Sequence, residues 1–321
     1  MLSSLTANPA RLGAACAALA VVMFSANDST IKFLSGDYAL HEVVLFRSVI
    51  GLLIVSVCVF PFAGGWRVIR TQRLVLHILR GLLVVFANIT FFLGLAVLPL
   101  ADAVAIFFVS PLLITVFSVV FLGEQVGPRR WVAVLVGFLG VLIVQRPGTE
   151  AFQLASLLPV LAATSYAGLH MMTRFIGKTE SAATMTVYIQ LTFIVVCLLF
   201  WLIAGDGRFA DQENASLAFL FRAWVWPEPG DWWLFLLIGF ATGFGGFLIS
   251  QAYRVAEAAV VAPFEYLALP IAIVAGYLIF GEVPDTLTFA GIALILGAGL
   301  FIIWREAVAE QDMVDVPRAR R

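Results

Sequence analysis

The sequence has little charge and an excess of apolar residues. Of its 321 residues, 12% are Asp, Glu, Lys or Arg and 62% are hydrophobic. A soluble domain has about 25% charged and about 45–50% apolar residues. This composition excludes an ordinary water-soluble protein and makes the lipid bilayer the solvent of the chain. The net charge of −1 gives no basic surface for a nucleic-acid partner.

Cysteines and catalytic motifs are also scarce. The three cysteines, Cys16, Cys58 and Cys197, lie in apolar runs, and their spacing fits neither a metal site nor a disulfide framework. The chain has no His-Glu-x-x-His, no P-loop and no Gly-x-Ser-x-Gly motif. We therefore expect no metal and no cofactor, and a membrane-embedded enzyme is an alternative that no motif supports.

Long apolar runs are what the sequence does contain. A membrane-spanning helix needs about 20 mostly apolar residues, and ten runs meet or approach that length. The longest connection, 205–231, is more polar and predicts a surface loop or a short interfacial helix. The ten predicted helices cover residues 12–34, 41–61, 75–97, 101–122, 129–146, 153–174, 183–204, 232–253, 258–280 and 286–304.

One pattern in these runs occurs twice. Ala101-Asp102-Ala103-Val104 opens a run that stops at Gly123-Glu124, and Ala256-Glu257-Ala258-Ala259 opens one that stops at Gly281-Glu282. A duplicated hydrophobic unit is typical of transporters built from two related halves. We predict one repeat over residues 1–150, a second over 151–306, and a polar tail over 307–321.

The placement of Lys and Arg predicts the orientation. If the N-terminus is cytoplasmic, most basic residues fall on the inner side, among them Arg67, Arg129 and Arg174, and few fall outside. Both termini are then cytoplasmic in a bacterial inner membrane. Because five helices per half is an odd number, the second half enters the membrane inverted. The predicted fold is thus an all-α membrane protein with ten transmembrane helices, as two inverted five-helix repeats around a central cavity.

Three ionisable residues lie deep within predicted helices, where a charge is costly unless it has a partner or faces a cavity. Asp28 and Arg47 lie at similar depths in the first two helices. They predict a pair that gates or orients a solute, or else a structural salt bridge, or Asp28 paired with Lys32 one turn away. Glu265 is suited to proton coupling or to the binding of a cationic group. The alternative is that it is a neutral acid, hydrogen-bonded across helices.

Other polar groups and prolines complete the candidate site. Polar side chains in mid-helix either contact solute or join helices, and prolines bend helices that could move. The predicted lining residues are Tyr166, His170, Tyr266, Asn88 and Gln251, and the predicted kinks are Pro111, Pro263 and Pro270.

Short motifs in these helices resemble the drug/metabolite transporter superfamily, in its ten-helix EamA-type branch with two EamA repeats. The matching stretches are Ser25-Ala26-Asn27-Asp28, Phe46-Arg47, Leu79-Arg80-Gly81, Ser110-Pro111, Gly123-Glu124, Arg130-Trp131, Tyr166, Ala262-Pro263 through Tyr266, and Gly281-Glu282. Their order and spacing cover nearly the whole chain.

The resemblance implies a secondary transporter that moves a small organic metabolite by alternating access, with protons among the possible coupling ions. Within the branch, the sequence is most similar to bacterial S-adenosylmethionine uptake transporters, and riboflavin transporters are a close competitor. Glu265 departs from the basic residue that we expect there in the S-adenosylmethionine group. Export of amino acids or drugs is the alternative within the superfamily, and a non-transporting membrane sensor is an alternative outside it.

Overall fold

The computed structural model describes residues 9–63, 65–123, 127–149, 153–176, 180–256, 261 and 264–314. Within these ranges the chain forms helices and no strands, which confirms the predicted all-α class. Nine segments of the described chain are long and apolar enough to cross a membrane, and Ala268–Phe280 is a shorter apolar helix. The tenth predicted span, 258–280, falls partly outside the described residues.

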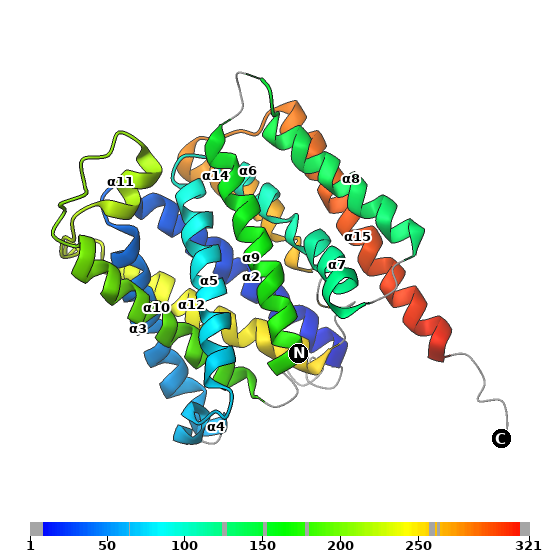
Figure 1. Cartoon of the computed structure of the whole chain (residues 1–321), viewed down its shortest axis with the longest axis horizontal. Coiled ribbons are helices and arrows are strands. Elements are labelled where there is room, and N and C mark those ends of the chain that lie inside the picture. Colours follow the sequence, from blue (N-terminus) through cyan, green and yellow to red (C-terminus); the bar gives the residue numbers. More distant parts are fainter. Residues whose placement is uncertain are drawn as a thin grey trace.

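The helices follow the predicted order (Figure 1). Those of the first half are α2 (Pro9–Leu34), α3 (Leu40–Cys58), α5 (Leu74–Leu95), α6 (Leu100–Phe107), α7 (Ser110–Leu122) and α8 (Pro128–Gln145). Those of the second half are α9 (Leu157–Ile176), α10 (Ala182–Ala204), α12 (Trp232–Val255), α14 (Ala268–Phe280) and α15 (Thr286–Val314). Short elements join them: α4 (Phe60–Ala63), η1 (Gly65–Ile69), η2 (Leu154–Ser156) and α11 (Ala215–Phe221).

Most observed helix bounds lie within a few residues of the predicted ones. The structure adds detail in one connection and at the end of the last helix. The long connection 205–231 contains α11, the short helix that was one of its two predicted forms. α15 continues to Val314, so the first residues of the predicted polar tail are helical.

Both copies of the Gly-Glu stop signal end a helix in the same way. Gly123 ends α7 with a φ of 67°, and Gly281 ends α14 with a φ of 68°. This left-handed conformation suits glycine because it has no Cβ. Glu124 lies outside the described residues, whereas the Glu282 N–H donates to the Gly276 carbonyl at 3.0 Å.

The fourth predicted helix is broken in two. Its first part, α6, ends at Phe107, and α7 begins at Ser110. Pro111 occupies the first turn of α7, where the backbone N–H that proline lacks would have no partner within the helix. The proline therefore lies at the start of a new helix, and the helical run is disturbed by a turn at Phe108 and Val109, just before it.

The ninth predicted helix has a similar break. Tyr266 and Leu267 form a turn before α14, and Pro270 lies in the first turn of that helix. Pro263 lies outside the described residues. Both halves thus contain an interrupted helix whose second part begins next to a proline.

Helices from the two halves pack against one another rather than within each half. α2 packs along α12, and α5 packs along α9. α8 packs along α15, and α3 contacts both α12 and α10. α10 also contacts α5, α7 contacts α9, and α14 contacts α2 and α6. The helices at corresponding places in the two halves are α2 and α9, α3 and α10, α5 and α12, α6–α7 and α14, and α8 and α15. When each helix is exchanged for its counterpart, every contact named above becomes a contact of the same set.

Glycines allow the tightest of these crossings. A Cβ added at Gly140 of α8 would lie 2.8 Å from the Gly291 carbonyl oxygen of α15, and one added at Gly291 would lie 2.7 Å from the Gly140 oxygen. Small residues permit such close backbone approach between membrane helices.

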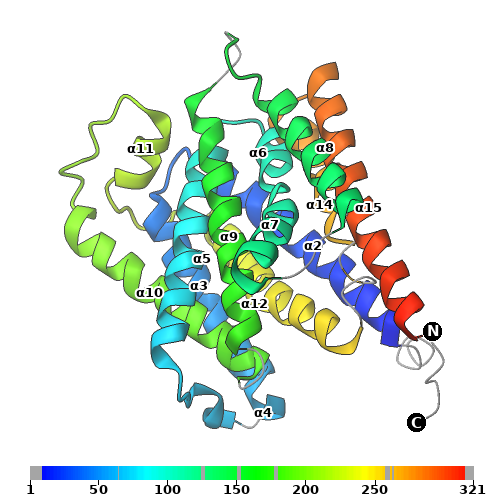
Figure 2. The ribbon, with the colours of Figure 1, turned by 45° about the vertical axis from the view of Figure 1, so that its right-hand side comes forward.

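The bundle has two distinct ends. The start of α2 and the end of α15 lie at one end, called here the terminal end (Figure 2). The connections that follow α2, α5, α8, α10 and α14 form the opposite end, called here the Lys32 end.

Candidate functional site

Arg47 lies inside the bundle on α3, with 3% of its surface exposed. Its Nη2 donates to Asn88 Oδ1 of α5 at 3.0 Å. The guanidinium also lies 5.6 Å from the ring centre of Phe92 and 5.2 Å from that of Phe193. Aromatic faces stabilise a desolvated cation, so α3, α5 and α10 together hold a buried positive charge.

Asp28 of α2 lies within electrostatic range of Arg47. Its Oδ1 accepts from Asn27 Nδ2 at 3.0 Å, and Asn27 Oδ1 in turn accepts from the Thr242 hydroxyl of α12 at 3.1 Å. The ion pairs of the described residues do not include Asp28 with Arg47. The pairing of Asp28 with Lys32 that we considered is also absent from them, since Lys32 bonds to other groups.

Tyr166 of α9 is the centre of a second group. Its ring lies 4.6 Å from that of His170, edge to face, and 5.3 Å from that of Phe107 at the end of α6. Arg80 of α5 is near enough to interact electrostatically with Tyr166. It is held by Thr173, whose hydroxyl accepts from Arg80 Nε at 2.9 Å.

The break before α14 faces the same group. Glu265 is half-buried and interacts electrostatically with both Tyr166 and Tyr266. The Tyr266 ring lies 5.0 Å from that of Phe108, in the break between α6 and α7. The two interrupted helices therefore place their break residues beside each other and beside α9.

The structure brings most of the predicted site residues into these two groups. Asp28, Arg47 and Asn88 form one, and Tyr166, His170, Glu265 and Tyr266 form the other. Gln251 lies half-buried near the end of α12. Sequence reasoning did not select Phe92, Phe193 or Thr242, because aromatic and hydroxyl residues are common in membrane helices.

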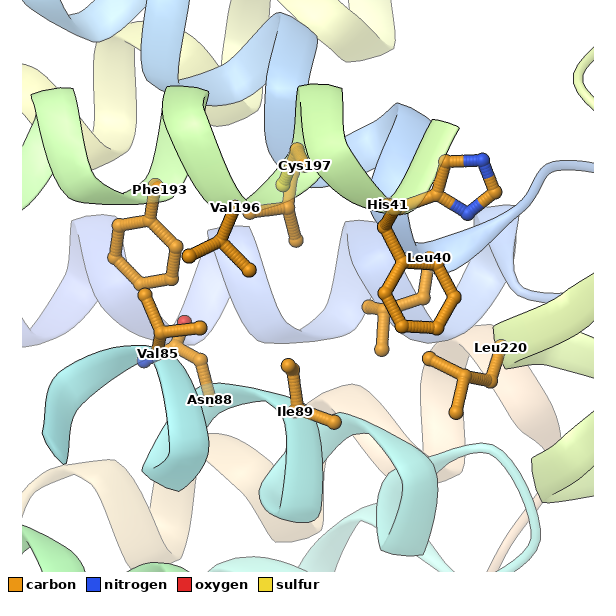
Figure 3. A pocket seen from close by; sticks show the side chains of 11 residues that line it. Leu40, His41, Val85, Asn88, Ile89, Phe193, Val196, Cys197 and Leu220 are labelled. Atoms are coloured by element: carbon orange, nitrogen blue, oxygen red, sulfur yellow. The ribbon is translucent and has the colours of Figure 1, made fainter. Parts of the chain in front are cut away.

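A small cavity adjoins the first group, between α3, α5, α10 and α11. Asn88 and Ile89 of α5 face Val196 and Cys197 of α10 across it (Figure 3). Its volume of about 20 Å³ has room for about one water molecule. Metabolite sites occupy about 300–1,000 Å³, so this cavity would have to widen before it could admit a solute.

Comparison with known proteins gives a consistent result. Residues 11–146 match the model of the EamA-like transporter family. An S-adenosylmethionine uptake transporter of Rickettsia felis is 32% identical over 291 residues, which cover 91% of this chain and 92% of that protein. A riboflavin transporter of Rhizobium johnstonii is 32% identical over 311 residues, which cover 96% of this chain and 97% of that protein.

A relative that acts in export also matches. The pseudopaline exporter CntI of Pseudomonas aeruginosa is 28% identical over 288 residues, covering 89% of this chain and 94% of that protein. One solved crystal structure superposes with a TM-score of 0.62 at 17% identity, covering 91% of this chain and 98% of the other. At that identity the likeness shows a shared fold alone.

Proposed function

Because this chain belongs to the EamA-like transporter family, we propose that it is a secondary transporter of a small organic metabolite in a bacterial inner membrane. The observation that carries the proposal is the meeting of the two helix breaks at Tyr166, where Glu265 and Phe107 come from different halves of the chain. Interrupted helices facing each other are the usual setting of solute sites in carriers. A membrane enzyme or a sensor would not require this arrangement.

The packing of the helices supports two inverted repeats, residues 1–150 and 151–306. The main contacts are preserved when helices of the two halves are exchanged, as α2 with α9 and α12 with α5. The placement of basic residues supports a cytoplasmic location of the terminal end. A cysteine that replaces Arg129 would then react with an impermeant maleimide only in inside-out vesicles, and reaction in intact cells would refute this orientation.

The two groups of polar residues define the proposed solute site. Arg47 Nε has no hydrogen-bond partner among the described residues, so it could donate to a carboxylate. Asp28 and Glu265 could accept from cationic groups, and the rings of Tyr166 and Tyr266 could stack on a flat or cationic solute. Residues Asn88, His170 and Gln251 complete the proposed lining, with protons as the proposed coupling ion.

These chemical features favour S-adenosylmethionine over riboflavin. S-adenosylmethionine carries a carboxylate, an ammonium and a sulfonium, which match one basic and two acidic side chains in the proposed site. Glu265 departs from the basic residue expected in the S-adenosylmethionine group, and here it would face one of the two cationic groups of the solute. Riboflavin is uncharged and would use the aromatic rings alone. Export of amino acids or drugs is the second candidate and would use the same groups; a pseudopaline exporter is among the relatives.

Uptake by purified protein in proteoliposomes tests both the activity and the solute. We expect saturable uptake of radiolabelled S-adenosylmethionine that is lost in Glu265→Gln and Asp28→Asn. Asp206→Asn is the matched control, because Asp206 is an exposed carboxylate paired locally with Arg208. If the protein takes up riboflavin and Glu265→Gln does not change that uptake, riboflavin replaces S-adenosylmethionine as the proposed solute. If both site variants take up S-adenosylmethionine at the rate of the parent, the proposed site is refuted.

A further inference from the structure

Lys32, near the end of α2, has two strong hydrogen bonds at the Lys32 end. Its Nζ donates to Glu282 Oε1 at 2.6 Å and to the Leu98 carbonyl at 2.6 Å. The ammonium also lies 5.0 Å from the ring centre of Phe280. The Lys32 side chain is 10% exposed and that of Glu282 27%, so water has little access to the ammonium and partial access to the carboxylate.

Glu282 completes the contact with a different atom. Its Oε2 accepts from the Leu100 N–H at 2.8 Å. Leu100 is the first residue of α6, and its N-cap Pro99 has no side chain that could satisfy that N–H. A carboxylate is well placed there because the start of a helix carries partial positive charge.

Together the two side chains hold both sides of one turn. The cation holds the carbonyl before Pro99, and the carboxylate holds the N–H after it. The turn connects α5 to α6, which pack with α9. Lys32 and Glu282 instead belong to α2 and to the end of α14, which pack with each other. α14 also packs against α6, and the contact adds polar bonds from α2 and α14 to the turn before α6 at this end.

We propose that Lys32 and Glu282 act as one clamp on the Pro99 turn, which keeps the Lys32 end closed and must open in each transport cycle. The inference rests on the proposed function and assigns two positioning residues to it, apart from the solute site. Four charged or polar partners separate together when the turn moves, and at the membrane surface water can replace each lost bond. Such a contact is strong when closed yet reversible.

A nearby ion pair serves as a natural comparison. Arg146 at the end of α8 pairs with Asp285 before α15, at the same end and also between the two halves. That pair joins α8 to α15 and has no hydrogen bond to the Pro99 turn among the described residues, although the charge of Asp102 on α6 lies within electrostatic range of both pairs. Loss of this pair should leave the clamp intact.

Sided labelling of a buried reporter tests the clamp without any solute. Ala103 of α6 is fully buried one turn beyond Leu100, and Ala103→Cys is placed in a background in which Cys16, Cys58 and Cys197 are serine. An impermeant maleimide is added from the Lys32 end. We expect slow labelling in the parent and an increase of about tenfold or more in Lys32→Met and in Glu282→Gln, because each loses a charge-assisted contact. Arg146→Gln should label at the parental rate.

A charge swap separates the clamp from a simple ion pair. Lys32→Glu with Glu282→Lys restores opposite charges but faces a carboxylate toward the Leu98 carbonyl and an ammonium toward the Leu100 N–H. We expect labelling to stay fast in this double variant. Slow labelling in the swap, or parental labelling in both single variants, would overturn the proposal.

Two further measurements keep the outcome interpretable. Gel filtration of each variant as a single symmetrical peak shows that faster labelling does not come from unfolded protein. Solute uptake is measured in parallel. If no solute is taken up but the clamp variants still label faster than the parent, the result counts against the proposed function alone. Uptake with clamp-independent labelling counts against the clamp alone.

Discussion

The crossing of α8 and α15 makes a quantitative prediction about single added methyl groups. In Gly291→Ala the new Cβ would lie 2.6 Å from Val144 Cγ2 and 2.7 Å from the Gly140 carbonyl oxygen. Real Cβ atoms do not approach this closely, and a backbone oxygen cannot rotate away, so the two helices must separate. Overpacking of this kind costs about 1–3 kcal/mol.

Gly297, on the same helix, is the matched control. A Cβ added there would meet nothing within 4 Å. Both substitutions replace glycine with alanine within α15, so the gain in helix propensity of about 0.5–1 kcal/mol is common to both. The difference between the two variants therefore isolates the cost of the crossing.

The assay is thermal denaturation in detergent, followed by gel filtration of a fluorescent fusion. One kcal/mol shifts Tm by roughly 2–4 °C in proteins of about 150–250 residues. We therefore expect Gly291→Ala to melt about 2–12 °C below Gly297→Ala, with the latter at or above the parent. Equal melting of the two variants would refute the close crossing of these helices.

Three other changes address the connections between helices. Ser181→Ala removes the side chain that accepts from the Thr184 N–H at 3.0 Å at the start of α10, and should lower the free energy of unfolding by about 1 kcal/mol, measured as a lower Tm that Ser181→Asp restores. The hydrogen bond from Arg146 lowers the pKa of Asp285 from 3.8 to about 2, so its stabilisation is present above pH 3.8 and disappears as the pH falls toward 2. The difference in Tm between the parent and Asp285→Asn should shrink over that range, and a constant difference would contradict the assignment. Tyr38→Phe removes a hydroxyl that bonds to the α10–α12 connection, and we expect faster proteolysis within that connection and unchanged proteolysis elsewhere.

The sequence predicted the helices well because the bilayer sets their length. An apolar run of about 20 residues has few alternatives in lipid, where every backbone group must be bonded within the segment. The stop signals at Gly123 and Gly281 were also readable, since few residues other than glycine adopt a positive φ easily.

The site was less predictable, because its contacts depend on helix rotation. Arg47 was correctly recognised as buried and Asp28 is half-buried, yet depth alone did not indicate that Arg47 bonds to Asn88. The partner of Lys32 was missed for a similar reason. An acid four residues away, Asp28, was a plausible partner by spacing, but the side chain extends toward Glu282, 250 positions later.

The breaks illustrate a third limit. Proline in a helical run predicts a disturbance but not its position, since the first turn of a new helix also accepts proline. In the structure the helix is interrupted at Phe108 and Val109, before Pro111, and Phe108 packs against Tyr266 of the other break. Only the packing of neighbouring helices decides between a bend and an interruption.

The exchange relation among the helix contacts has an energetic consequence for a carrier of this design. If the two halves were identical in sequence, the conformations open to either side of the membrane would be related by a two-fold rotation and equal in free energy. Any resting preference must then arise from positions where the halves differ. One such position is Glu265, at about the level where the other half carries Phe107. A handful of side chains would thus set the ratio of the two conformations, and substitutions at these positions could reverse it while every helix crossing stayed the same.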